Sequence, residues 1–182
     1  MGCARGLDVA AGLLLALSAC AHGPGPGQAT LPDTRVALRL VDIGGETLNV
    51  AALRGQVVLL TVMTTWSEPA FLEVPLLSEL QREYAEDGFV VVAVLLDDDP
   101  RVMPIFRDTF QIPYRVTRAY DPAGLTGDQG PFGPIGVLPT SVLLDREGHI
   151  AARMDGVWPP GALRTAVRAL VSTEVAPDPG TQ

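Results

Sequence analysis

The stretch VVLLTVMTTWSEPAFLEVPLLSELQREY, residues 57–84, decides the fold. Residues 57–64 form a nearly unbroken run of apolar and β-branched side chains, which is typical of a strand buried on both faces of a sheet. The second half carries apolar side chains at three- and four-residue spacing, namely Phe71, Val74, Leu77, Leu80 and Tyr84. Charged residues, Glu73 among them, lie between these positions, and this alternation predicts an amphipathic helix.

The turn between the two halves, residues 64–70, reads TTWSEPA. A buried strand that leads directly into a helix N-terminus is a place where a thiol becomes acidic, because the helix dipole and the unpaired N–H groups favour a thiolate. This stretch resembles the TlpA/ResA-type thioredoxin-like disulfide oxidoreductases of bacterial envelopes, within the wider redoxin and AhpC/TSA-like group. Their pattern is a buried strand, then W-C-x-x-C, then a long helix.

Here the motif reads Trp66-Ser67-Glu68-Pro69-Ala70, so Ser67 and Ala70 stand where the family has its two cysteines. The chain therefore resembles a degenerate member of the family that lacks the CxxC pair. The resemblance covers roughly residues 34–172. It implies an α/β thioredoxin-like fold, with a central mixed β-sheet flanked by helices and a cis-proline loop.

A second element supports the same resemblance. The segment Val137-Leu138-Pro139-Thr140 resembles the family's G-V-P-T element, in which the proline is cis and lies against the W-C-x-x-C turn. Cis X–Pro bonds are uncommon in folded proteins, so keeping one implies a fixed backbone requirement. The resemblance implies a groove beside this proline, and we expect Trp66, Glu68, Pro69, Phe132, Val137, Leu138 and Pro139 to form it.

Composition excludes several classes of protein. The chain has 182 residues, 47% of them hydrophobic, and a net charge of −8, which describes one globular domain. It contains no lysine, and its arginines are scattered, so no basic surface for nucleic acid is predicted. The two cysteines, Cys3 and Cys20, both precede the predicted domain. That domain therefore has no disulfide, no thiolate metal ligand and no thiol nucleophile.

The N-terminal region resembles a lipoprotein leader. An apolar run too short to span a membrane ends in Leu17-Ser18-Ala19-Cys20, which resembles the lipobox whose cysteine is lipidated. An ordinary secretory cleavage site is the alternative. We therefore expect a signal peptide at residues 1–19 and lipidated Cys20 with a Gly/Pro-rich tether at residues 20–33. The domain then covers residues 34–172, and a disordered tail covers residues 173–182.

This leader predicts a lipid-anchored, periplasm-facing protein of the bacterial envelope. Ala21 follows the lipidated cysteine, which by analogy with enteric sorting rules indicates the outer membrane.

The remaining pattern predicts an edge hairpin over residues 36–50, a buried strand over residues 89–96 and a second hairpin over residues 141–154. A final helix is expected after Pro159-Pro160. We interpret the run of aspartates at 97–99 as including the cap of the next helix, whose apolar stripe includes Ile105, rather than as a metal site. The Gly/Pro-rich loop at 127–136 either roofs the site, with Phe132 pointing inward, or is a surface insertion.

The lack of cysteines in the motif limits the reactions that this domain can carry out. Disulfide exchange needs one thiolate to attack and a second to resolve, and neither the hydroxyl of Ser67 nor the methyl of Ala70 can do this. As a hydrolytic nucleophile Ser67 would need a base, yet the single histidine of the domain, His149, lies in the far hairpin. We interpret Ser67 as a helix N-cap whose side chain accepts a first-turn N–H. No metal site and no cofactor are expected.

Three functions fit this sequence. The first is a redox-inactive thioredoxin-like lipoprotein, not itself an enzyme, that binds an envelope protein or peptide along the groove beside Pro139. The second is a TlpA-like protein of cytochrome maturation or envelope redox homeostasis that works only with a partner's thiols. The third is a structural domain without a groove. An open apolar cleft beside Pro139 would favour the first, and a cleft filled by residues 127–136 the third.

Overall fold

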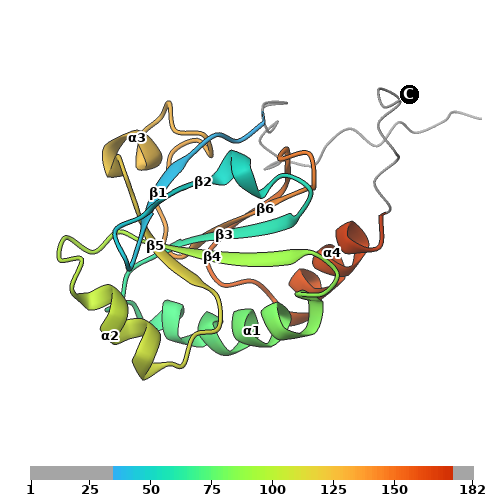
Figure 1. Cartoon of the computed structure of the whole chain (residues 1–182), viewed down its shortest axis with the longest axis horizontal. Helices are drawn as coiled ribbons and strands as arrows, with labels where there is room; N and C mark the ends of the chain where they lie inside the picture. Colours follow the sequence, from blue (N-terminus) through green and yellow to red (C-terminus); the bar gives the residue numbers. More distant parts are fainter. Residues whose placement is uncertain (1–34, 174–182) are drawn as a thin grey trace, which may run out of the picture. The chain divides into compact units, whose positions relative to one another are not determined.

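The computed structural model describes residues 35–173, and the elements in it follow from the sequence pattern (Figure 1). The strands are β1 Arg39–Asp42, β2 Thr47–Asn49, β3 Val57–Met63, β4 Phe89–Leu95, β5 Arg115–Ala119, β6 Thr140–Leu144 and β7 Ile150–Asp155. The helices are the 3-10 turn η1 Val50–Leu53 and α1 Glu68–Tyr84, α2 Val102–Thr109, α3 Pro122–Thr126 and α4 Pro160–Val171.

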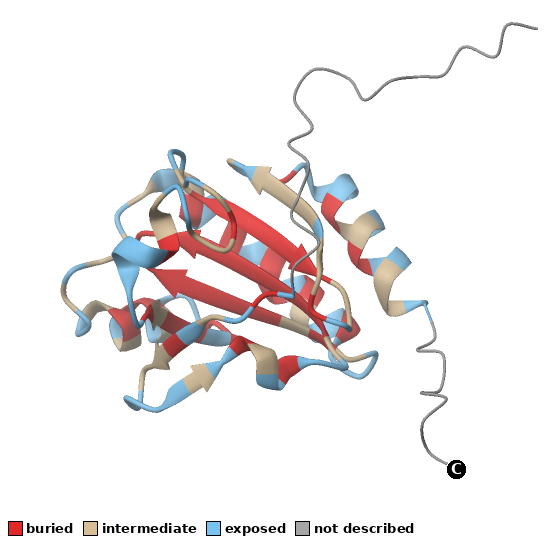
Figure 2. Ribbon diagram, turned by 90° about the horizontal axis from the view of Figure 1, so that it is seen from above, coloured by how far each residue is buried: buried red, intermediate tan, exposed pale blue. Residues whose placement is uncertain are grey.

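The described strands form one mixed sheet in the order β2-β1-β5-β4-β3-β6-β7. The three middle strands β5, β4 and β3 are parallel, whereas β1, β6 and β7 join antiparallel to their neighbours. Every residue of β3 is buried, and β4 is buried except for the half-buried Val90 (Figure 2). Strands covered on both faces in this way are nearly continuous apolar runs, which is why residues 57–63 show no alternation of apolar and polar side chains.

Helices cover both faces of the sheet (Figure 1). Alternate residues of β3, such as Leu59 and Met63, pack with apolar residues of α1, α2 and α4 in one core cluster. The intervening residues, such as Leu60, pack in a second cluster with Leu53 of η1, Leu125 of α3 and Phe132. The period-two alternation of a strand divides its side chains between these two cores.

The central strand, the long helix, the edge hairpin, the second hairpin and the final helix are all confirmed. The mixed sheet flanked by helices is confirmed too, and the Leu138–Pro139 peptide bond is cis as expected. The predicted signal peptide, Cys20, the tether and all but the first residue of the predicted tail lie outside the described residues. No helix within residues 35–173 is both long and apolar enough to cross a membrane.

Several local predictions are wrong. Strand β5 and helix α3 were not expected, because each has only 5 residues and β5 carries two arginines. The helix after β4 begins at Val102, and its N-cap residue, Arg101, makes no capping bond. Asp99 instead accepts a hydrogen bond from the Arg101 backbone N–H at 2.9 Å, in a turn before the helix. Ile105, expected in the buried stripe of α2, is exposed.

The apolar stripe of α1 also differs from the prediction. Phe71 is 38% exposed and stacks on Phe110, with ring centroids 5.3 Å apart. Glu73, expected on the polar face, is fully buried. The helix therefore has a carboxylate among the residues that it buries.

Candidate functional site

The candidate site begins where β3 ends. The turn Thr64-Thr65-Trp66-Ser67 leads from β3 into α1, and Ser67 occupies the N-cap position with extended backbone angles. Its side chain, however, makes no capping hydrogen bond. An N-cap side chain normally accepts from the second or third residue of the helix. Here the second is Pro69, which has no N–H, and the N–H of Ala70 donates to the Ser67 carbonyl at 3.0 Å. The predicted position is therefore right and the predicted capping bond is wrong.

Asp97 fixes the same turn from the neighbouring strand. Its carboxylate follows β4 and accepts hydrogen bonds from the Thr65 backbone N–H at 2.9 Å and from the Thr65 hydroxyl at 2.6 Å. Strands β3 and β4 are parallel and paired from Val57↔Phe89 to Met63↔Leu95, so the residues after both strands meet at one edge. This contact differs from the prediction, in which the aspartate run at 97–99 included the cap of the next helix.

Pro139 lies against the turn on its other side. Strand β6 pairs antiparallel with β3, with Thr140 opposite Val62, so Pro139 and Met63 are the next residues beyond that pair. The Pro139 carbonyl accepts a hydrogen bond from the Gly156 backbone N–H at 2.7 Å. This bond connects the cis-proline segment to the residues that follow β7, and three chain segments therefore meet around the proline.

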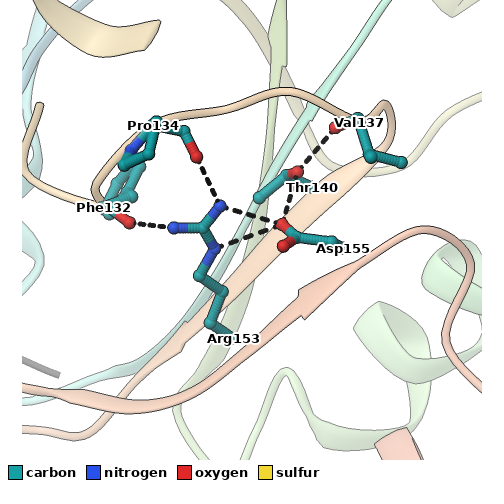
Figure 3. A network of polar contacts seen from close by, with 6 residues as sticks. All are labelled: Phe132, Pro134, Val137, Thr140, Arg153 and Asp155. Atoms are coloured by element: carbon teal, nitrogen blue, oxygen red, sulfur yellow. Dashed lines mark hydrogen bonds and ion pairs between the residues drawn. The ribbon is translucent and has the colours of Figure 1, made fainter. Parts of the chain in front are cut away.

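Arg153 of β7 holds the loop that precedes Pro139 (Figure 3). Its guanidinium donates to the carbonyl oxygens of Phe132 and Pro134, the latter at 2.7 Å, and pairs with Asp155 at 2.9 Å. The Thr140 hydroxyl lies 2.7 Å from the Val137 carbonyl and 3.0 Å from the same carboxylate. These contacts attach the loop at 127–136 to the sheet rather than leaving it as a free insertion.

Phe132 requires a correction. Its side chain is only 2% exposed and belongs to the core cluster on the α3 face, so it neither roofs the turn nor offers surface to a partner. Arg153 of β7 donates a hydrogen bond to the Phe132 carbonyl, and the ring of Phe132 packs in the core. We therefore remove Phe132 from the candidate surface.

The other residues expected in the groove differ in exposure. Trp66 is 75% exposed and Val137 is 51% exposed, whereas Pro69 and Leu138 are half-buried and Pro139 is buried. Glu68 is exposed in the first turn of α1. Val157 was not expected here; it is 39% exposed and follows Gly156, whose backbone N–H donates to the Pro139 carbonyl. We name Trp66, Val137 and Val157, which lie on the three segments that meet at Pro139, together with the Pro139 backbone, the Pro139 surface.

Glu73 lies beneath this surface in a buried chain of hydrogen bonds. Its carboxylate accepts from the Trp158 backbone N–H at 3.2 Å and from the Thr61 hydroxyl at 3.3 Å. The Ser141 hydroxyl donates to Thr61 at 3.0 Å, so the chain links β6, β3, α1 and the segment after β7. Burial raises the pKa of Glu73, although the two accepted hydrogen bonds oppose this. The pKa of Tyr114 is also raised, mainly by burial and then by the charge of Glu73.

The site offers no thiol, because residues 35–173 contain no cysteine. The single histidine within residues 35–173, which would be the base for Ser67, lies elsewhere. His149 lies in the β6–β7 turn at the far end of β6, and its Nδ1 is 3.5 Å from the Asp145 carboxylate. Within the described part of the chain, no group of three His, Cys, Asp or Glu residues could hold a metal ion. What the arrangement provides is exposed apolar surface around a rigidly held proline.

Comparisons with known proteins identify the family and the fold. A family model described as Redoxin matches residues 26–170. The thiol-disulfide oxidoreductase ResA of Oceanobacillus iheyensis is 28% identical over 125 residues, covering 69% of this chain and 62% of the relative. The chain therefore spans less than two thirds of that relative's length.

Two solved structures show the same fold. A candidate thiol:disulfide interchange protein DsbE from Chlorobium tepidum has a TM-score of 0.65 and 29% identity, covering 77% of this chain and 96% of that one. A secreted thiol-disulfide isomerase from Corynebacterium glutamicum has a TM-score of 0.68 and 21% identity, covering 77% and 86%. The predicted thioredoxin-like fold is confirmed. The correspondence of Ser67 and Ala70 to the cysteine positions stays a prediction.

Proposed function

The chain belongs to the Redoxin family and is a thioredoxin-like protein related to thiol-disulfide oxidoreductases, and we propose that it binds polypeptide without using thiols. One observation carries this proposal. Trp66, Val137 and Val157 lie on the three chain segments that meet at Pro139, and they are three of the eight large apolar residues that the described domain leaves exposed. Large exposed apolar side chains that gather at one place are typical of interaction sites. An extended peptide would place its side chains against them.

The TlpA-like alternative, in which the chain works with a partner's thiols, fits the names of the relatives. It requires the partner to supply both the attacking and the resolving thiol, because Ser67 and Ala70 supply neither. The two proposals differ in one respect. A thiol-independent binder holds a peptide whose cysteines are blocked, whereas the alternative predicts that blocking them abolishes the interaction.

The binding proposal is tested with reduced, carboxymethylated insulin B chain as a thiol-blocked, unfolded probe. We expect the full-length protein to bind it, and Trp66→Ala to weaken the affinity about tenfold or more, because exposed aromatic anchors contribute a large share of peptide-binding energy. Ile105→Ala is the control, since this exposed residue of α2 lies outside the Pro139 surface. Fluorescence anisotropy of the labelled probe gives the Kd. No binding at all would favour the structural-domain interpretation, and equal affinities for the wild type and Trp66→Ala would show that the probe binds away from the Pro139 surface.

We also propose that Cys20 is lipidated and anchors the protein to the envelope membrane, most simply the outer membrane. The lipobox-like residues before Cys20 support this, and three acyl chains exceed the two signals that stable anchoring needs. Cys20→Ala should move the protein from the membrane pellet to the soluble fraction and abolish incorporation of labelled palmitate. If both the fractionation and the labelling match the wild type, ordinary secretory processing is the correct interpretation.

A further inference from the structure

The edge of the sheet that carries the Pro139 surface also collects negative charge. Glu68 follows the end of β3 by five residues, and Asp97 and Asp98 follow the end of β4 after Leu96. Asp97 is fixed at the turn by its two hydrogen bonds to Thr65, and this places Asp98 beside the turn as well. Glu68 and Asp98 are both exposed, and neither forms an ion pair with another residue in the range 35–173.

The arginines at this edge offset that charge only in part. Arg101 pairs with Asp99 at 2.6 Å, and Arg153 pairs with Asp155 at 2.9 Å, so each contributes little net charge. Arg118 lies at the end of β5 opposite Leu95, so it is at the same edge, and it forms no ion pair within residues 35–173. Three carboxylates, Glu68, Asp97 and Asp98, therefore follow the ends of β3 and β4, where Arg118 is the neighbouring unpaired arginine, and the residues around these two strand ends keep a net negative charge.

We propose that the partner of the Pro139 surface is a polypeptide segment with apolar side chains flanked by lysine or arginine. This inference rests on the proposed binding function and names the chemistry of its partner. The apolar residues of the partner would cover Trp66, Val137 and Val157, and its cations would lie against Glu68 and Asp98. Complementary charge at the rim of an interface selects among partners and speeds association, and like charges opposite each other are disfavoured. An anionic segment would meet three carboxylates at this edge.

The test uses three labelled, cysteine-free peptides with the same Val-Ile-Phe-Val centre, flanked on each side by two lysines, two serines or two glutamates. We expect the full-length protein to bind the lysine-flanked peptide about three- to tenfold more tightly than the serine-flanked one, and the glutamate-flanked peptide most weakly, because exposed ion pairs contribute modestly. At 1 M salt, where the Debye length falls to about 3 Å, the preference should shrink to less than about twofold.

Two double variants locate the effect. Glu68→Gln/Asp98→Asn removes two carboxylates at this edge and leaves the Asp97–Thr65 contact in place, so it should abolish most of the preference for lysine. Glu86→Gln/Glu147→Gln changes the net charge by the same amount at the opposite end of the sheet, after α1 and in the β6–β7 hairpin, and should preserve the preference.

The outcomes separate this inference from the function on which it rests. Loss of binding of all three peptides would overturn both. Binding that depends on Trp66 but is equal for the three peptides would overturn the charge inference and keep the binding function. A preference that both double variants weaken equally would show that the net charge of the protein, rather than Glu68 and Asp98, attracts the cations.

Discussion

Replacing Ser67 and Ala70 together with cysteine should convert a domain without thiols into one that forms an intramolecular disulfide. Ser67 is the N-cap of α1 and Ala70 is the third helical residue, so the two lie one turn apart. Residues at this spacing are about 5–6 Å apart, within the range over which disulfides form. The helix N-terminus should lower the pKa of the new thiol at position 67 below the value of about 8.5 for a free thiol. Exposed Glu68 and buried Glu73 should limit that decrease.

The disulfide content of the double variant in a series of glutathione redox buffers measures this, and a titration of thiolate absorbance gives the pKa. The single variants Ser67→Cys and Ala70→Cys are the controls, and they should form only mixed disulfides with glutathione. If the double variant forms no internal disulfide in oxidising buffer, then Ser67 and Ala70 do not occupy the two cysteine positions of the family.

Glu73→Gln should make the domain progressively more stable than the wild type as pH rises. In the unfolded chain Glu73 loses its proton near its ordinary pKa of 4.5, whereas in the folded domain burial raises the pKa. The folded state therefore binds more protons, and its free energy of unfolding falls as pH rises from about 4.5 through the raised value. Glutamine avoids this loss, because its carbonyl can accept from Trp158 and its amide can donate to Thr61.

The difference in free energy of unfolding between Glu73→Gln and wild type should grow by about 1.4 kcal/mol for each unit by which the pKa of Glu73 is raised. Urea denaturation at several pH values between 4 and 8 (about one pH unit apart) measures it. Glu86→Gln, an exposed carboxylate after α1, is the control and should stay within about 0.5 kcal/mol of wild type at every pH. A difference that shrinks as pH rises would mean that the hydrogen bonds to Glu73 outweigh its burial.

Hydrophobic periodicity predicted the strands and helices in which buried and exposed positions follow a regular pattern. The run at residues 57–63 is apolar because both faces of β3 are covered, and the helix stripe at Leu77 and Leu80 faces the sheet. The prediction failed at Glu73 and Phe71, because tertiary partners decide those positions. Glu73 is buried because Thr61 and Trp158 satisfy its carboxylate, and neither partner is near it in the sequence.

The candidate site also combines features that the local sequence predicts with features that depend on tertiary contacts. The motif at Trp66 and the element at Pro139 could be recognised locally, and the sheet brings them together. The contact between Asp97 and Thr65 depends on the register of two parallel strands, which no local pattern specifies. Phe132 was placed at the site because its loop precedes Pro139, yet Arg153 binds the carbonyl of this residue and leaves the ring in the core.

The most direct test of thiol-independent binding is to map the contact by NMR with the serine-flanked peptide, which contains no cysteine. Amide chemical shifts of the full-length protein are recorded as the peptide is added. We expect the changes to concentrate at residues 64–69, 136–140 and 156–158, which form the Pro139 surface and its supporting turns. Shift changes confined to other parts of the domain, or none at saturating peptide, would contradict the proposal that this surface binds polypeptide.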